Sequence, residues 1–102
     1  MSNIPQSTKD AVRRRAEDRC EFSGGIYNLE YAHIAHRRMG GRHGKWKKIY
    51  DDPRNIALLA HNWHEVMHGV DCELKTKLIM FLKLKTDWYG WVREYGIGEN
   101  DD

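Results

Sequence analysis

The histidines of this chain are its most chemically informative residues. All six lie between positions 33 and 68 of a chain of 102 residues. Histidine is the most common metal ligand, and it is also the usual general base near neutral pH. Histidines gathered in so short a stretch indicate a site that binds a metal ion or moves a proton.

The last two histidines lie in residues 64–68, which have the pattern H-E-x-x-H. Residues four apart share one face of a helix, so His64 and His68 can reach the same metal ion. In zinc metalloproteases with this pattern the glutamate, here Glu65, is the general base. A zinc metalloprotease is therefore one interpretation of the chain. The extended protease pattern is missing, because Asp71 stands where it requires glycine and no histidine follows His68.

The charge of the chain is unevenly distributed. The net charge of +2 divides into +6 for residues 1–50 and −4 for residues 51–102. Residues 31–50 contain no acidic side chain, and their basic side chains are Arg37, Arg38, Arg42, Lys45, Lys47 and Lys48. Such asymmetry favours a polyanion as the partner of the basic half.

The elements that must position these residues follow from periodicity and turn signals. Apolar residues at steps of three and four predict helices, and short runs of β-formers predict strands. We expect a helix over 7–19 with Ser7 as its N-cap, strands over 29–34 and 55–59, a loop over 36–54, a helix over 61–69, and a helical segment over 72–95 broken at Asp87 or Gly90.

Composition places the chain among ordinary globular domains. Apolar residues make up 40% and charged residues 31%, and the length suits one domain, 1–102, of class α+β. The longest uncharged apolar run, residues 78–82, is too short to cross a membrane. No signal-peptide pattern is visible and the two cysteines form no C-x-x-C pair, so we expect a cytoplasmic protein with reduced thiols.

The order of these features resembles the HNH endonucleases, whose site has a ββα-metal (His-Me finger) architecture. The resemblance is carried by residues 29–34, the Arg-Arg-Met-Gly-Gly segment 37–41, residues 51–59 and the helix 64–69. The chain looks most like the small HNH proteins of phages and prophages. The similarity covers about residues 20–69, with 70–95 as a helical extension and 96–102 as a tail.

The resemblance implies a role for each matching residue. His33 matches the general base that takes a proton from the attacking water, and Asn55 matches the asparagine that holds the loop and orients that base. His64 and His68 match metal ligands for one divalent ion, which is Mg, Mn, Ni or Zn. The basic side chains of the loop would hold the phosphates of double-stranded DNA. The implied function is metal-dependent hydrolysis of DNA phosphodiester bonds, in a bacterial host or phage-infected cell.

The chain departs from the family pattern at three places. Many members have Asp or His before the base, where this chain has Ala32, so the site would use His64 and His68 with water or substrate oxygens, or borrow His36. Many members also have two C-x-x-C pairs that bind a structural zinc. Here Ser23 follows Cys20 where the first pair has its second cysteine, and Ala60 and Trp63 replace the second pair. This implies that the structural zinc is absent and that Trp63 fills its place by apolar packing. The loop between His33 and Asn55 is longer than in compact members.

Two further points follow from the resemblance. A monomer would nick one strand and a homodimer would cut both, and phage packaging proteins are candidate partners. A DNA-binding module with a degenerate catalytic site is the other interpretation, and Ala32 is the residue that favours it.

Overall fold

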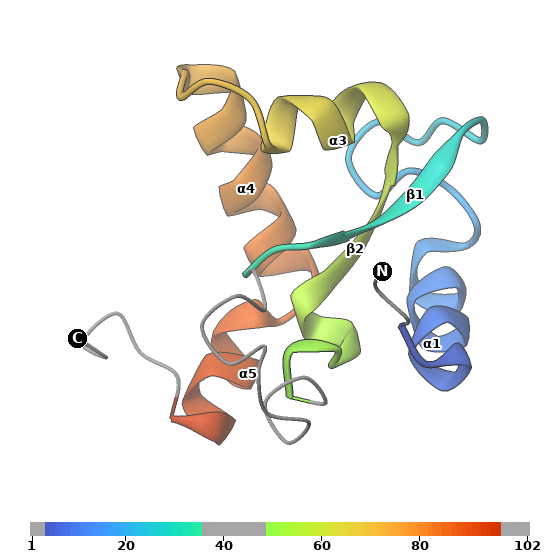
Figure 1. The fold of residues 1–102 in the computed structure, drawn as a ribbon, viewed down its shortest axis with the longest axis vertical. Coiled ribbons are helices and arrows are strands. Elements are labelled where there is room, and N and C mark those ends of the chain that lie inside the picture. The colour runs from blue at the N-terminus through green and yellow to red at the C-terminus, as the bar shows by residue number, and fades with distance from the viewer. Residues whose placement is uncertain (1–3, 36–48, 97–102) are drawn as a thin grey trace.

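A computed structural model describes residues 4–35 and 49–96. Its elements are the helix α1 (Gln6–Ala16), the strand β1 (Leu29–His33), the 3₁₀ turn η2 (Pro53–Asn55), the strand β2 (Ile56–Ala60) and the helices α3 (His61–Met67), α4 (Glu73–Lys85) and α5 (Trp88–Tyr95) (Figure 1). The described residues thus form a small α+β structure with four α-helices, which confirms the predicted class. None of the described helices is long and apolar enough to cross a membrane.

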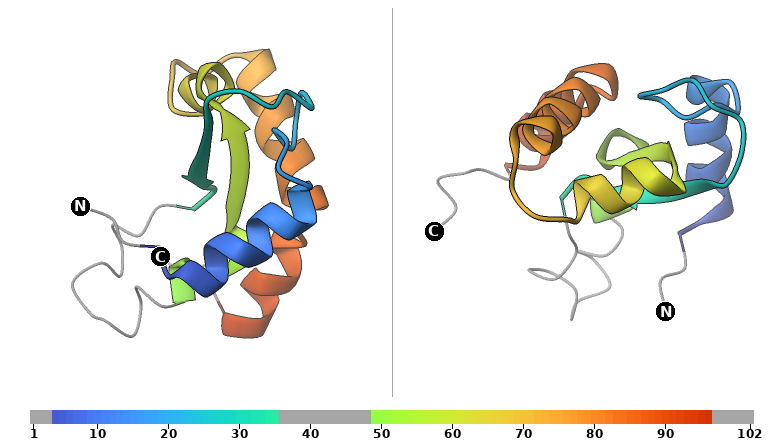
Figure 2. Two further views of the ribbon diagram at one scale, coloured as in Figure 1. Left: turned by 90° about the vertical axis from the view of Figure 1, so that its right-hand side faces the viewer. Right: turned by 90° about the horizontal axis from the view of Figure 1, so that it is seen from above.

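The two strands form an antiparallel sheet with helices on both faces. The register runs from Leu29 opposite Ala60 to His33 opposite Ile56. Because side chains alternate between faces, each strand contributes to two cores. One core joins the sheet to α1 through Val12, Ala16, Ile56 and Leu58. The other joins it to α3 and α4 through Ala32, Ala57, Leu59, Met67, Leu78 and Leu82. The sheet therefore lies between α1 and the later helices (Figure 2).

The first helix is shorter than the sequence predicts. It ends at Ala16, because Glu17 and Asp18 both adopt a left-handed conformation with φ of 56°. The prediction of Ser7 as N-cap was wrong, since Ser7 lies inside the helix and Pro5 occupies the cap without a side-chain hydrogen bond. The early end lets the chain turn back toward β2.

The predicted helical segment over 72–95 divides at Thr86 and Asp87. Asp87 has a φ of 61° and precedes α5. The buried Thr86 hydroxyl donates to the Arg54 carbonyl at 2.8 Å, which fixes the junction against η2. Gly90 continues the helix, and the Asp87 carboxylate occupies the space that a Cβ at Gly90 would need.

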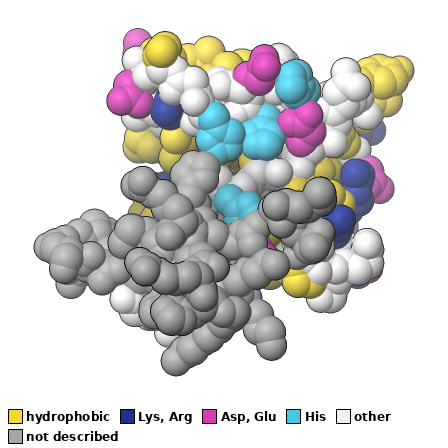
Figure 3. Space-filling model, viewed as in Figure 1, with side chains coloured by type: hydrophobic (Ala, Val, Ile, Leu, Met, Phe, Trp, Pro, Cys, Tyr) yellow, Lys and Arg dark blue, Asp and Glu magenta, His cyan; other side chains and the backbone are white. Residues whose placement is uncertain are grey.

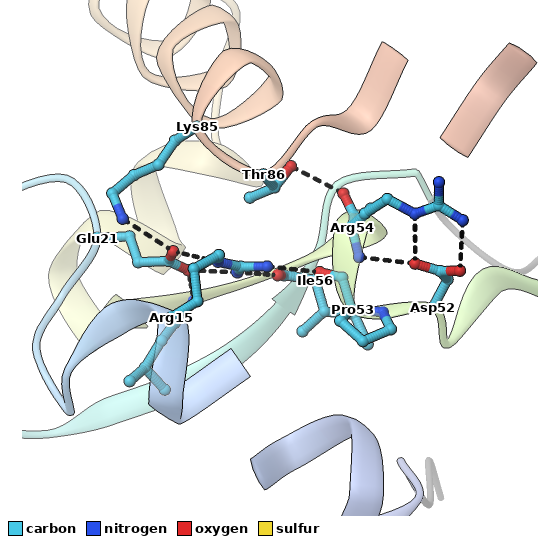
Figure 4. A network of polar contacts seen from close by, with 9 residues as sticks. Arg15, Glu21, Asp52, Pro53, Arg54, Ile56, Lys85 and Thr86 are labelled. Atoms are coloured by element: carbon cyan, nitrogen blue, oxygen red, sulfur yellow. Dashed lines mark hydrogen bonds and ion pairs between the residues drawn. The ribbon is translucent and has the colours of Figure 1, made fainter. Parts of the chain in front are cut away.

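A buried ion pair joins most of these elements. The Glu21 carboxylate is fully buried and accepts two 2.7 Å hydrogen bonds from Arg15 (Figure 4). It also accepts from the Leu58 backbone N–H at 2.8 Å and from Lys85 at 3.2 Å. Arg15 in turn donates to the carbonyls of Pro53 and Ile56, at 2.9 and 2.7 Å. One carboxylate thus links α1, β2 and α4.

We predict that Glu21→Gln destabilises the fold. Burial raises the pKa of Glu21, but the hydrogen bonds and charges of Arg15, Leu58 N–H and Lys85 outweigh burial and leave that pKa below 4.5. The carboxylate therefore contributes stability above pH 4.5 that is lost as the pH falls through its pKa in the folded protein. The variant should lose roughly 3–5 kcal/mol of unfolding free energy at pH 7.

Urea unfolding at pH 7 and at pH 3 measures this effect. The matched control is Glu73→Gln, whose side chain is 83% exposed and should change stability by less than about 0.5 kcal/mol. Equal stability of the two variants at pH 7 would contradict the prediction.

Candidate functional site

His33 ends strand β1 and is held by a carboxylate that sequence reasoning missed. Its Nε2 lies 2.7 Å from Oδ1 of Asp51, and the two side chains are 14% and 3% exposed. A carboxylate on one ring nitrogen fixes the orientation of an imidazole and stabilises its protonated form. Asp51 belongs to the Asp-Asp-Pro segment of the sequence, but nothing in that segment says which aspartate turns inward.

Asn55 is fully buried, and its amide makes four hydrogen bonds. Its Oδ1 accepts from the Ala35 N–H at 2.8 Å and from the Trp88 indole N–H at 3.0 Å. Its Nδ2 donates to the carbonyls of Ala35 and Tyr50, each at 2.9 Å. Ala35 lies two residues after His33, so Asn55 fastens the backbone that follows the end of β1. Its own carbonyl also accepts from Ile34 N–H at 2.8 Å.

The last turn of α3 and its C-cap residue bring His64 and His68 together. Their ring centroids are 4.8 Å apart with the planes inclined at 55°, as expected for residues one helical turn apart. Nδ1 of His64 lies 2.7 Å from Oε1 of Glu30 in β1. Glu30 and the neighbouring Ala60–His61 junction are close because β1 and β2 pair antiparallel, with Glu30 opposite Leu59.

His61 occupies the other oxygen of the same carboxylate. Its Nδ1 lies 2.8 Å from Glu30 Oε2, and its Nε2 lies 3.2 Å from Glu65 Oε2. Glu30 and then Glu65 raise the pKa of His61, while His64 and then His61 lower the pKa of Glu30. Both nitrogens of His61 therefore face carboxylates, whereas His64 uses only Nδ1 in this contact.

These side chains line one open pocket of about 270 Å³. Its lining residues are Glu30, His61, His64, Glu65 and His68. Histidine side chains gather on this face of the molecule, with acidic side chains beside them (Figure 3). In the part of the chain that the structure describes, no group of three or more His, Cys, Asp and Glu side chains is arranged to hold a metal ion. His64 and His68 would therefore need further ligands from solvent or substrate.

Several of the predicted residues lie outside the described ranges. They are the basic side chains Arg37, Arg38, Arg42, Lys45, Lys47 and Lys48, together with His36, the histidine proposed as a further ligand. Ala32 is fully buried in the core shared with α3 and α4. Trp63 packs edge-on against Phe22 with ring centroids 4.7 Å apart, which agrees with the apolar packing predicted for it.

The chain matches no protein-family model, no curated protein and no solved structure.

We predict that Asn55→Asp destabilises the protein by roughly 2–4 kcal/mol, because a carboxylate would face the carbonyl oxygens of Ala35 and Tyr50 with no proton to donate. Thermal unfolding of the variant measures this effect. Asn62→Asp makes the same chemical change at an exposed position and serves as the control. If both variants unfold at the same temperature, the amide network does not hold the loop.

Proposed function

We propose that this chain is a metal-dependent DNA endonuclease of the HNH type, with a ββα-metal core formed by β1, β2 and α3. One observation carries the proposal. His33 is held at 2.7 Å by the buried Asp51, while Asn55 fastens the backbone just beyond it. An imidazole with a fixed orientation and a carboxylate partner is what a general base requires. The order strand, loop, strand and His-x-x-x-His helix supports the same function.

In this proposal His33 takes a proton from the water that attacks the phosphorus atom. Asp51 stabilises the imidazolium that results, as a carboxylate does beside other catalytic histidines. Asn55 keeps His33 in place through the backbone of Ala35. His64 and His68 would hold one divalent ion (Mg, Mn, Ni or Zn), which supplies positive charge to the phosphate and to the leaving 3′-oxygen. The products would carry 5′-phosphate and 3′-hydroxyl ends.

The proposed substrate is double-stranded DNA. The basic segment between His33 and Asn55 would contact phosphates, so affinity should fall steeply with salt. A monomer would nick one strand, and a homodimer would cut both. Bacterial cytoplasm, as host or phage-infected cell, is the compartment that this proposal implies, with phage packaging proteins as candidate partners.

We predict that the purified chain cleaves supercoiled plasmid in the presence of Mg²⁺, Mn²⁺, Ni²⁺ or Zn²⁺, measured as conversion to open-circular or linear DNA on a gel. His33→Ala should lower the rate by about 100-fold or more, because a positioned general base typically contributes 10²–10⁴-fold. His64→Ala should lower the rate as well, since it removes a proposed metal ligand.

Glu65→Gln is the discriminating variant in this assay. The endonuclease proposal expects it to cut plasmid at nearly the normal rate, because Glu65 is 70% exposed and, within the described residues, forms an ion pair with His61 alone. A zinc metalloprotease would show the reverse, with Glu65→Gln inactive on a peptide substrate and His33→Ala active. If the chain binds DNA in a salt-sensitive way but cleaves it with none of the four metals, the interpretation as a DNA-binding module with a degenerate catalytic site is favoured instead.

A further inference from the structure

The pocket on α3 contains a carboxylate that neither the H-E-x-x-H pattern nor the family resemblance assigns. Glu30 stands on the same face of β1 as Ala32, since residues two apart on a strand share a face. Ala32 on that face has no ligand atom and packs into the core with Met67 of α3. Glu30 is therefore the strand residue that brings a charged group to the histidines of α3.

The hydrogen bond between Glu30 and His64 determines which nitrogen of His64 carries the proton. A carboxylate can only accept, so the 2.7 Å contact places the proton on Nδ1 of His64. A neutral imidazole with its proton on Nδ1 has its lone pair on Nε2, the nitrogen left for a metal ion. A hydrogen bond from a carboxylate to the far nitrogen also makes the ligating nitrogen more basic.

The Glu30 carboxylate is itself held in place. Its second oxygen lies 2.8 Å from Nδ1 of His61, and His61 is held from its other nitrogen by Glu65 at 3.2 Å. The Glu30 carboxylate thus contacts both His61 and His64 directly, while Glu65 has no direct contact with Glu30 or His64 among the described residues. His61 faces carboxylates at both nitrogens and so serves as a support for Glu30, whereas the contact of His64 with Glu30 uses Nδ1 and leaves Nε2 for a metal ion.

We propose that Glu30 is the positioning residue of the metal site, acting through His64. It selects the Nδ1–H form of His64 and thereby raises the affinity of the His64 and His68 pair for a divalent transition metal. This inference rests on the metal role of His64 in the proposed function. It adds the prediction that metal affinity depends on a strand residue outside the His-x-x-x-His helix.

We predict that Glu30→Ala weakens Co²⁺ binding by about 10–100-fold, the effect typical of losing a carboxylate behind a ligating histidine. Isothermal titration of the purified chain with Co²⁺ alone measures it. The matched control is Glu65→Ala, which removes the same charge from the same pocket but leaves the Glu30–His64 hydrogen bond in place. It should weaken binding by no more than about threefold. If the two variants lose the same amount of Co²⁺ affinity, Glu30 acts only through its negative charge, and the proposal is overturned.

The second readout needs no metal. Nitrogen NMR of the metal-free chain, at a pH where the His61 and His64 rings are neutral, should show His64 protonated at Nδ1. The Glu30→Ala variant should shift His64 toward the Nε2–H form, while Glu65→Ala should not. A merely structural role of Glu30 would change stability but not the proton position. Nε2–H in the wild-type chain, or an unchanged form in Glu30→Ala, would overturn the proposal.

His64→Ala and His68→Ala separate this inference from the proposed function. If they abolish Co²⁺ binding and Glu30→Ala does not weaken it, the positioning role alone is wrong. If neither histidine variant weakens binding, the metal site and the positioning role both fall. If Co²⁺ affinity depends on Glu30 and His64 but the chain cuts no DNA, the endonuclease proposal is wrong and the positioning role of Glu30 is still supported.

Discussion

Strand β2 must satisfy backbone groups on two edges, and β1 covers only one of them. On the other edge, the Glu21 carboxylate accepts from Leu58 N–H, the Glu21 N–H donates to Leu58 C=O, and Arg15 donates to Ile56 C=O. Buried backbone groups without partners are costly, and an open strand edge invites association. The Arg15–Glu21 pair thus closes a sheet of two strands, and this closure keeps β2 between α1 and α4.

The candidate site inherits its geometry from that closure. Asn55 directly precedes β2, and His64 lies in the helix that directly follows it. Both ends of one short buried strand therefore carry groups of the site. The partner strand β1 supplies Glu30 and His33, which the antiparallel register places opposite Leu59 and Ile56. A shift of one residue in this register would separate Glu30 from His64 and turn the buried Ala32 outward.

The sequence predicts the order of helices and strands well, but it does not show which carboxylates hold the fold and the candidate site together. Both strands lie within one residue of their predicted bounds, because runs of β-formers between turn signals are local features. Apolar spacing alone does not tell which side of α4 is buried, since Leu78 and Leu82 are fully buried while Leu74 and Phe81 are more than 40% exposed. Asn55, His64 and His68 stand out by their spacing. Glu21, Glu30 and Asp51 do not, because each finds its partner across the tertiary fold and no periodic pattern marks them.

The Asn55 amide has a consequence for how the chain can vary. It bonds to Ala35 and to Tyr50, so one side chain joins two backbone positions that lie on either side of the basic segment in the sequence. The position of His33 therefore does not depend on the length or sequence of that segment. Doubling the length of a flexible loop costs only about 0.6 kcal/mol in closure entropy. Changes of sequence length between Ala35 and Tyr50 should therefore cost little stability and leave His33 and Asp51 in place.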